Sequence, residues 1–279
     1  MADRVSEEER RSLLEELGTL VKERGAETFL AAPLREPTPR DFPDSFEPTV
    51  RGVETLLRRI LGYAGIGEYD VVLETFSRTE EIRELDDRGE KKAWGHDGAA
   101  AWFAGISEGR VHFGVAEENM GGDPTTLVAT LCHEVAHAWR HHHGLAEVDR
   151  DAEEFLTDLS TVYLGFGVLT TNGAYVYRQG GEYTGTVAIS RWSHSRAGYL
   201  SPESMSFLLA VQVKARGIGW WGRRRIAGRL EANQSAHFRW ALGTLGSAQD
   251  VREALWIETR SHDQMSPAGA AAARPDSSP

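Results

Sequence analysis

The residues best suited to chemistry lie in one short segment, 131–140, with the sequence LCHEVAHAWR. His133 and His137 are four positions apart, and residues at that spacing share one face of a helix, so their imidazoles can converge on one ion. Glu134 lies about 100° further round the helix, at ~3.6 residues per turn. There it can reach a water on the metal without ligating the metal. Two imidazoles with an adjacent carboxylate base predict a zinc hydrolase.

A third ligand is predicted from the acidic segment 153–158, EEFLTD. Glu154 and Asp158 are again four positions apart, so they also share a helix face. Glu154 can complete a site of two histidines and one glutamate. Asp158 lies in an otherwise apolar run, where a carboxylate needs a partner, and it can accept the second ring N–H of a ligand histidine.

These residues resemble the HExxH zinc metallopeptidases called zincins. More narrowly, they are similar to the gluzincins, the thermolysin-like group, in which an ExxxD element follows HExxH on the next antiparallel helix. The resemblance covers roughly residues 100–165, and the matching positions are His133, Glu134, His137, Glu154 and Asp158. It implies that Glu154 ligates zinc, that Asp158 supports a ligand histidine, and that the protein cleaves peptide bonds. The spacer between His137 and Glu154 is shorter than expected for thermolysin itself.

Other third ligands stay open at this point. Metzincins use HExxHxxGxxH, and His143 stands at the spacing of their third histidine. Arg140 occupies the position of their helix-breaking glycine, however, and a helix that continues to residue 143 carries that histidine away from the ion. The remaining alternatives are carboxylates of the next segment: Glu147, Asp151, Glu153 and Asp158.

A donor that stabilises a transition-state oxyanion is expected downstream, because zinc peptidases of this type take a His, Tyr or Arg from there. His194 and Tyr199 are the leading candidates, since residues 191–199 are dense in polar and aromatic groups. Tyr163 and Tyr175 are weaker candidates. The strand predicted at 110–116 is expected to be an edge strand that could bind an extended peptide through main-chain hydrogen bonds.

The elements that position these residues follow from periodicity and capping signals. Residues 124–143 predict a helix, with Asp123 as N-cap, Pro124 in its first turn and Gly144 beyond its end. A second helix is predicted at 149–164. Strands are predicted at 70–76, 100–106 and 110–116, the last two as a hairpin. Further predictions are helices at 6–23, 50–62, 201–215, 223–245 and 248–257, and an irregular hairpin at 173–190.

The order of these elements predicts an α+β fold. It is expected to be mostly helical, with a small upstream β-sheet packed on a two-helix, zincin-like core. Residues 1–48 are predicted to form an N-terminal helix and a Pro-rich connector, and residues 49–260 the metallohydrolase domain. The tail at 261–279 is rich in Ala, Pro, Ser and Gly and is expected to be disordered.

The amino-acid composition limits which binding partners and which metal-ligating side chains are expected. The 279 residues carry a formal net charge of −11, which disfavours nucleic acid and anionic membranes as partners. The basic, aromatic run at 219–225 is interpreted as the start of a helix. Cys132 is the single cysteine, so any zinc site must use imidazole and carboxylate, and we expect this cysteine to be a small buried residue.

Histidine use and the N-terminus complete the picture. Five of the ten histidines lie between 133 and 143. His141, His142 and His143 are interpreted as a solvated helix end, where imidazolium suits the helix dipole. The N-terminus lacks the apolar core of a signal peptide, so the cytoplasm is the expected location.

The leading hypothesis is a zinc metallopeptidase that acts on a peptide or protein substrate, with Glu134 as general base. The alternative is a non-catalytic zinc protein that binds a partner through residues 191–225. A structural zinc site would be closed by a fourth His or Cys, which distinguishes the two. A third possibility is that the cluster is a helical surface that binds no metal.

Overall fold

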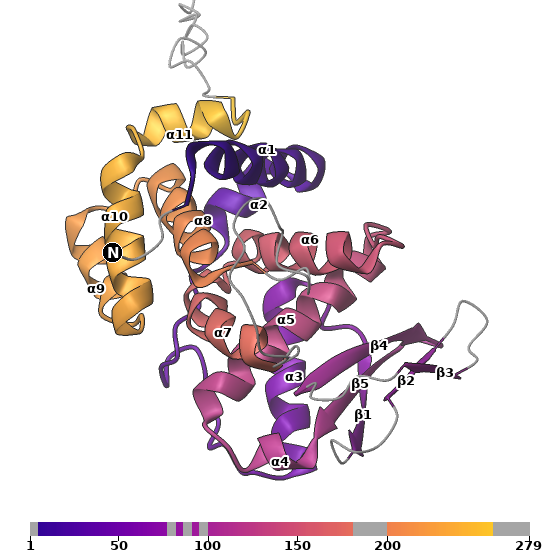
Figure 1. Ribbon diagram of the computed structural model, residues 1–279. Coiled ribbons are helices and arrows are strands. Elements are labelled where there is room, and N and C mark those ends of the chain that lie inside the picture. Colours follow the sequence, from indigo (N-terminus) through magenta and orange to yellow (C-terminus); the bar gives the residue numbers. More distant parts are fainter. Residues whose placement is uncertain (1–4, 77–81, 86–90, 95–99, 181–199, 259–279) are drawn as a thin grey trace, which may run out of the picture.

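The computed structural model describes residues 5–76, 82–85, 91–94, 100–180 and 200–258 (Figure 1). Helices dominate this part of the chain, and a small three-stranded mixed sheet precedes most of them in sequence. The predicted α+β class is therefore confirmed. Among the helices in those ranges, none combines the length and the apolar character needed to span a bilayer.

The sheet is built from β1 (Asp70–Phe76), β4 (Ala101–Ser107) and β5 (Arg110–Ala116), in the order β1-β5-β4. β4 and β5 form the predicted antiparallel hairpin, and β1 lies parallel to β5 on its other side. The prediction that strand 110–116 is an edge strand is wrong, because the parallel pairing with β1 makes it the central strand. A separate antiparallel pair, β2 (Ile82–Leu85) and β3 (Lys91–Trp94), was not predicted.

A close cross-strand contact and a bulge shape β4. A Cβ atom at Gly114 of β5 would lie 2.1 Å from the Trp102 ring, so only glycine leaves room for that ring. The pairing register shifts between Phe103 and Gly105, and Gly105 has φ 121, which glycine adopts readily. The bulge bends β4 where it approaches the helix that carries the two histidines.

The two helices of the predicted site form as expected. α5 (Pro124–His142) starts at Asp123, whose side chain accepts a hydrogen bond from the Thr126 amide, and ends before Gly144, which has φ 67. α6 (Arg150–Tyr163) starts at Asp149, whose side chain accepts from the Ala152 amide. α5 contacts β4, α6, α7 and α3 (Val50–Ala64), so it lies at the centre of the molecule.

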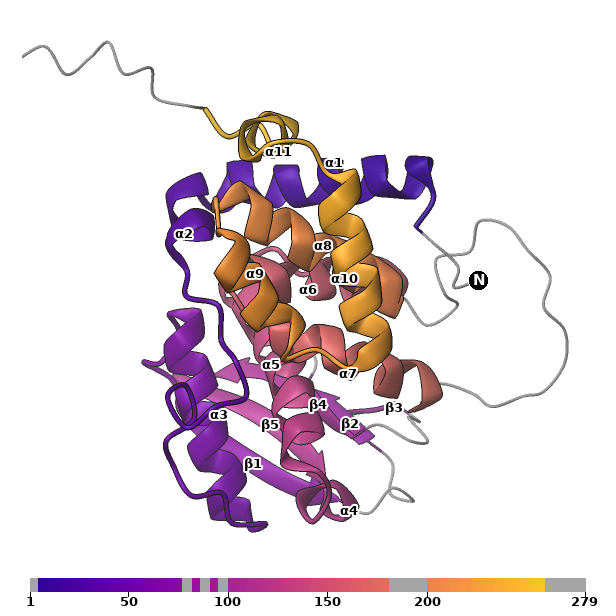
Figure 2. The same cartoon turned by 90° about the vertical axis from the view of Figure 1, so that its left-hand side faces the viewer.

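The remaining helices surround this centre. They are α1 (Glu7–Arg24), α2 (Ala26–Ala31), α4 (Glu117–Met120), α7 (Gly167–Gly180), α8 (Pro202–Ala215), α9 (Trp220–Ala227), α10 (Ala232–Thr244) and α11 (Ala248–Ala254). In Figures 1 and 2 the sheet, α3 and α4 occupy the lower half, and α1, α8, α10 and α11 occupy the upper half. α5, α6 and α7 lie between the two halves and connect them.

Two predicted elements differ from the structure. The single helix predicted at 223–245 is two helices, α9 and α10, because the first ends at Gly228 and the second starts after Glu231. The irregular hairpin predicted at 173–190 is wrong as far as residue 180, where α7 continues as a helix. The rest of that prediction lies outside the described residues.

One large apolar cluster runs through both halves of the molecule, from Leu13 and Leu17 of α1 to Phe113 of β5 and Leu209 of α8. Several polar side chains are nevertheless buried between α5 and α6. Burying such groups is costly unless each has a partner, so their arrangement needs an explanation. They are His133, Glu134, Arg140, Glu154, Thr157 and Asp158.

Candidate metal centre

The polar cluster is formed where α5 and α6 pack against each other. His133 of α5 faces Asp158 of α6, while His137, one turn later, faces Glu153. The partner number falls as the histidine number rises, so the two helices are antiparallel here. The i, i+4 spacing in each helix therefore brings two residues of one helix opposite two of the other.

Three of these side chains converge on one point. Oε2 of Glu154 lies 3.0 Å from Nε2 of His133 and 3.2 Å from Nε2 of His137. The ligand atoms of the three residues all lie within 4.8 Å of one another, so the group could hold a metal ion. His133 is fully buried, and the His137 and Glu154 side chains are only 14% and 10% exposed.

The other ring nitrogen of each histidine has its own partner. Nδ1 of His133 lies 3.0 Å from Oδ1 of Asp158, whose Oδ2 accepts a hydrogen bond from the Leu200 amide. Nδ1 of His137 lies 3.0 Å from the Thr157 hydroxyl. With both Nδ1 atoms engaged, the Nε2 atoms are the ones that face Glu154. Asp158 thus contacts His133, one of the two histidines that the sequence predicts as ligands.

Glu134 stands beside the cluster but outside the group of ligand atoms. Its Oε2 accepts a hydrogen bond of 2.8 Å from the Phe103 amide, so β4 holds this carboxylate in place. Burial raises the pKa of Glu134, and the neighbouring histidines oppose that effect in part. A carboxylate with a raised pKa, set next to a potential metal, is suited to take up a proton.

The charged groups of the cluster shift one another's pKa values. Burial lowers the pKa of His133, but hydrogen bonds to Asp158 and Glu154 outweigh it and hold the pKa well above its usual value. In the same way, burial is outweighed at His137, where Glu153 and Glu154 raise the pKa to about 9. Burial also opposes ionisation of Glu154, yet the two imidazoles hold its pKa below its usual range. Without a metal, these shifts favour cationic imidazoles beside an ionised Glu154.

The donor set could hold a metal ion, and two of its separations can be compared with those of a zinc site. Tetrahedral zinc with ligands at ~2 Å places neighbouring ligand atoms about 3.3 Å apart, close to the two observed separations from Glu154. Imidazole and carboxylate are both common zinc ligands. Cys132 is buried as expected, and burial raises the pKa of its thiol, which keeps the thiolate out of this site.

The other three histidines at the end of α5 contact residues outside the cluster. His143 caps α5, and its Nδ1 lies 2.7 Å from Nη2 of Arg24, so it does not join the cluster. Nδ1 of His142 lies 2.7 Å from the Tyr69 hydroxyl, and the His141 ring packs edge-on against Phe103. His141 and His142 are exposed, in keeping with the predicted helix end.

The structure describes only some of the predicted oxyanion donors. His194 and Tyr199 lie outside the described residues, as does the side chain of Tyr175. Tyr163 is buried in the core, and its hydroxyl donates to the carbonyls of Arg24 and Gly25. Proposing Tyr163 as an oxyanion donor is therefore wrong, because its only polar atom is directed away from the cluster and toward α1.

Sequence reasoning missed the roles of three residues that surround His137. Arg140 binds Glu153 through two nitrogens, and Thr157 contacts both Glu153 and His137. The sequence predicts Glu153 only as an alternative ligand. The available signal was Arg140 itself, a charged residue one turn after His137 on a helix with few exposed positions.

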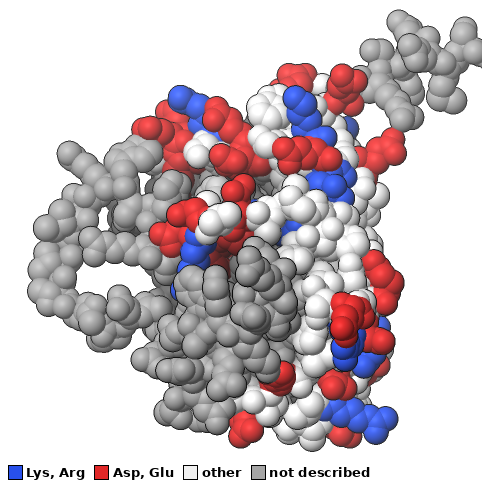
Figure 3. Space-filling view, turned by 90° about the vertical axis from the view of Figure 1, so that its right-hand side faces the viewer, with Lys and Arg blue, Asp and Glu red and all other residues white. Residues whose placement is uncertain are grey.

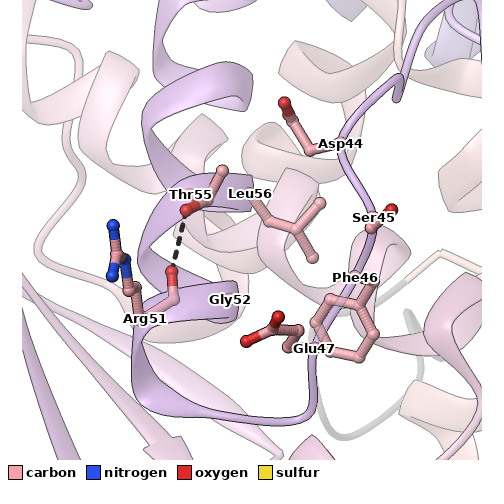
Figure 4. A pocket seen from close by; sticks show the side chains of 8 residues that line it. All are labelled: Asp44, Ser45, Phe46, Glu47, Arg51, Gly52, Thr55 and Leu56. Carbon is pink, nitrogen blue, oxygen red and sulfur yellow. Dashed lines mark hydrogen bonds between the residues drawn. The ribbon is translucent and has the colours of Figure 1, made fainter.

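The pocket of about 370 Å³ in Figure 4 lies apart from this cluster, between residues 44–47 and the first turns of α3. It shares no residue with the His133, His137 and Glu154 group. Figure 3 shows more acidic than basic side chains on the described part of one face, in keeping with the net charge of −11. Neither feature adds a residue to the candidate centre.

Comparisons of the chain with protein-family models, with curated proteins and with solved structures gave no match. The functional conclusion therefore rests on the residues of this chain and their geometry.

Proposed function

We propose that this protein is a zinc-dependent hydrolase and that its substrates are peptides. The observation that carries the proposal is Oε2 of Glu154, which faces Nε2 of both His133 and His137 while Glu134 stands beside them unligated. This is a ligand set of the kind used by catalytic zinc sites, with three protein ligands and a nearby carboxylate that is not a ligand. It agrees with the resemblance of the sequence to the gluzincins.

The residues of the chain have separate tasks in this proposal. His133, His137 and Glu154 hold the metal, and Asp158 and Thr157 fix the two imidazole rings through Nδ1. The bound zinc supplies Lewis-acid activation of water and of the scissile carbonyl. Glu134 accepts the proton of the attacking water on its carboxylate and passes it to the leaving amine. The Phe103 amide keeps that carboxylate on the side of β4.

Preference for peptides is argued from β4. Among the described strands it is hydrogen-bonded only to β5, and β2 contacts it without pairing, which leaves it at an edge of the three-stranded sheet. An extended peptide can add to such an edge through main-chain hydrogen bonds. Because the Phe103 amide of β4 contacts Glu134, a peptide held along this strand would pass close to the proposed base.

The test is hydrolysis of reduced, unfolded casein by the zinc-loaded protein, with products identified by mass spectrometry. Glu134→Gln should keep its zinc and lose at least 100-fold of the rate, since general acid–base catalysis contributes roughly 10²–10⁴-fold. Glu147→Gln is the matched control, because this exposed residue lies outside the ligand group and its side chain should not matter.

Other results would contradict the proposal. A Glu134→Gln variant with full activity removes this residue from the mechanism. A wild-type protein that binds zinc stoichiometrically but cleaves nothing supports the non-catalytic alternative, in which the ion stabilises a binding protein.

A further inference from the structure

A buried ion pair lies next to the candidate centre. Nε and Nη2 of Arg140 lie 3.0 and 2.9 Å from the two carboxylate oxygens of Glu153. The Arg140 side chain is 3% exposed and that of Glu153 is 15% exposed. Pairs this buried contribute little net stability, because desolvation offsets the attraction. The close contact between Arg140 and Glu153 is therefore better explained by a role other than stabilising the fold.

The pair connects three consecutive segments of the chain. Arg140 belongs to the last turns of α5 and also donates to the Leu145 carbonyl in the loop between the helices. Glu153 belongs to the first turn of α6 and accepts a hydrogen bond from the Glu147 amide of the same loop. The end of one helix, the loop and the start of the next are thus fixed to one another. This accounts for how so short a spacer can align α5 with α6.

The pair also reaches the metal-ligand residues directly. Oε1 of Glu153 lies 3.4 Å from Nδ1 of His137 and 3.4 Å from the Thr157 hydroxyl, which itself lies 3.0 Å from that Nδ1. Glu154, the next residue along the chain, presents Oε2 to Nε2 of the same histidine. The orientation of His137 is therefore set from both ring nitrogens by adjacent residues of one helix turn.

We infer that Arg140 and Glu153 are positioning residues of the metal centre: together they orient the His137 ring and align α6 so that Glu154 meets both histidines. This inference rests on the proposed function, because it assumes that the cluster binds a metal. Neither residue touches the metal in this arrangement, and their effect is exerted through His137 and Glu154.

The experiment measures Co²⁺ affinity by competition with a chelator, and the visible absorption of the bound cobalt, in the chain of 279 residues. Glu153→Gln should weaken binding 10–100-fold and change the absorption bands, as the loss of partners to ligand residues commonly does. Arg59→Met is the matched control, because Arg59 forms a 2.6 Å ion pair with Asp44 and neither residue belongs to the ligand group. It should leave affinity and spectrum unchanged.

A second variant distinguishes a role in positioning the ligand residues from a role in merely joining the two helices. Arg140→Met combined with Glu153→Leu replaces the pair by apolar groups of similar size, which can restore stability to a buried site. We expect this double variant to unfold at a temperature near that of the wild type and still bind Co²⁺ at least tenfold more weakly. If the pair only joins the two helices, the affinity for Co²⁺ should recover together with the stability of the fold.

The outcomes are distinguishable from failure of the proposed function. A wild-type protein that binds neither Co²⁺ nor Zn²⁺ overturns both conclusions. A wild type that binds and hydrolyses, with Glu153→Gln and the double variant binding Co²⁺ as tightly and with the same spectrum, overturns only the positioning role.

Discussion

At the scale of single residues, the two ring nitrogens of each histidine have different partners, and this arrangement defines the centre. Nδ1 of His133 and of His137 contacts a side chain of α6, and Nε2 of each faces Glu154. A ring held through one nitrogen presents the other in a fixed direction, which is what a metal ligand needs. The same contacts raise the pKa of both histidines in the metal-free protein.

Those raised pKa values predict proton release on metal binding. Zinc requires neutral imidazoles, so both Nε2 protons must leave when it binds. Because the pKa of His137 is raised to about 9 and that of His133 is also raised, the doubly protonated, cationic form of each ring is favoured at pH 7. We therefore expect more than one proton released per zinc at pH 7, fewer at pH 9 and above, and affinity that rises with pH between them.

Calorimetry in two buffers of different ionisation enthalpy counts these protons. Two imidazoles with ordinary pKa values of about 6.5 would together release only about half a proton at pH 7. A release that small, or an affinity that does not change between pH 7 and 9, would contradict the charge arrangement described for the cluster.

At the scale of elements, the sequence was most informative where the signal is local. Asp123 and Gly144 mark the two ends of α5, and Asp149 marks the start of α6, because capping depends on residues within one turn. The central place of β5 was not predictable in this way. It depends on parallel pairing with β1, which is about 40 residues distant in the sequence and leaves no local signal.

The contact between Gly114 and Trp102 gives a prediction about the sheet. In Gly114→Ala the new methyl would overlap the Trp102 ring, so β4 and β5 must separate. Overpacking of this kind costs about 1–3 kcal/mol. We expect a matching fall in the free energy of unfolding in urea, and weaker catalysis because Phe103, the next residue on β4, holds Glu134.

Gly62→Ala is the control for that substitution. Gly62 lies in helix α3 and a Cβ atom there meets nothing within 4 Å, so alanine should stabilise by about 0.5–1 kcal/mol. Equal stability of Gly114→Ala and the wild type would show that the Trp102 ring is not fixed over Gly114.

At the scale of the whole molecule, the candidate centre is a small group of polar side chains buried within one apolar core. The pairs His133–His137 and Glu154–Asp158 were predictable because each depends on spacing within one helix. The contacts of Glu134 with β4 and of Arg140 with Glu153 join separate elements, so only the folded structure reveals them. An ion at the centre would bind α5 to α6 and thereby stabilise the packed core.

Metal binding should therefore raise thermal stability. A ligand that binds only the folded state at 100 times its Kd stabilises by about 2.7 kcal/mol, or a rise in Tm of about 5 °C for a chain of this size. Zinc added to chelator-treated protein should produce this rise in differential scanning calorimetry. Glu154→Gln should lose most of it, and an equal rise in that variant would point to zinc bound elsewhere.

The central claim is that α5 and α6 together hold one zinc ion, and zinc stoichiometry in matched histidine variants tests it most directly. His137 and His141 stand one turn apart on α5, yet only the first belongs to the ligand group. After zinc loading and removal of free metal, elemental analysis should find one zinc per chain in the wild type and in His141→Ala. It should find almost none in folded His137→Ala. Equal zinc content in the two variants, or none in the wild type, would contradict the account.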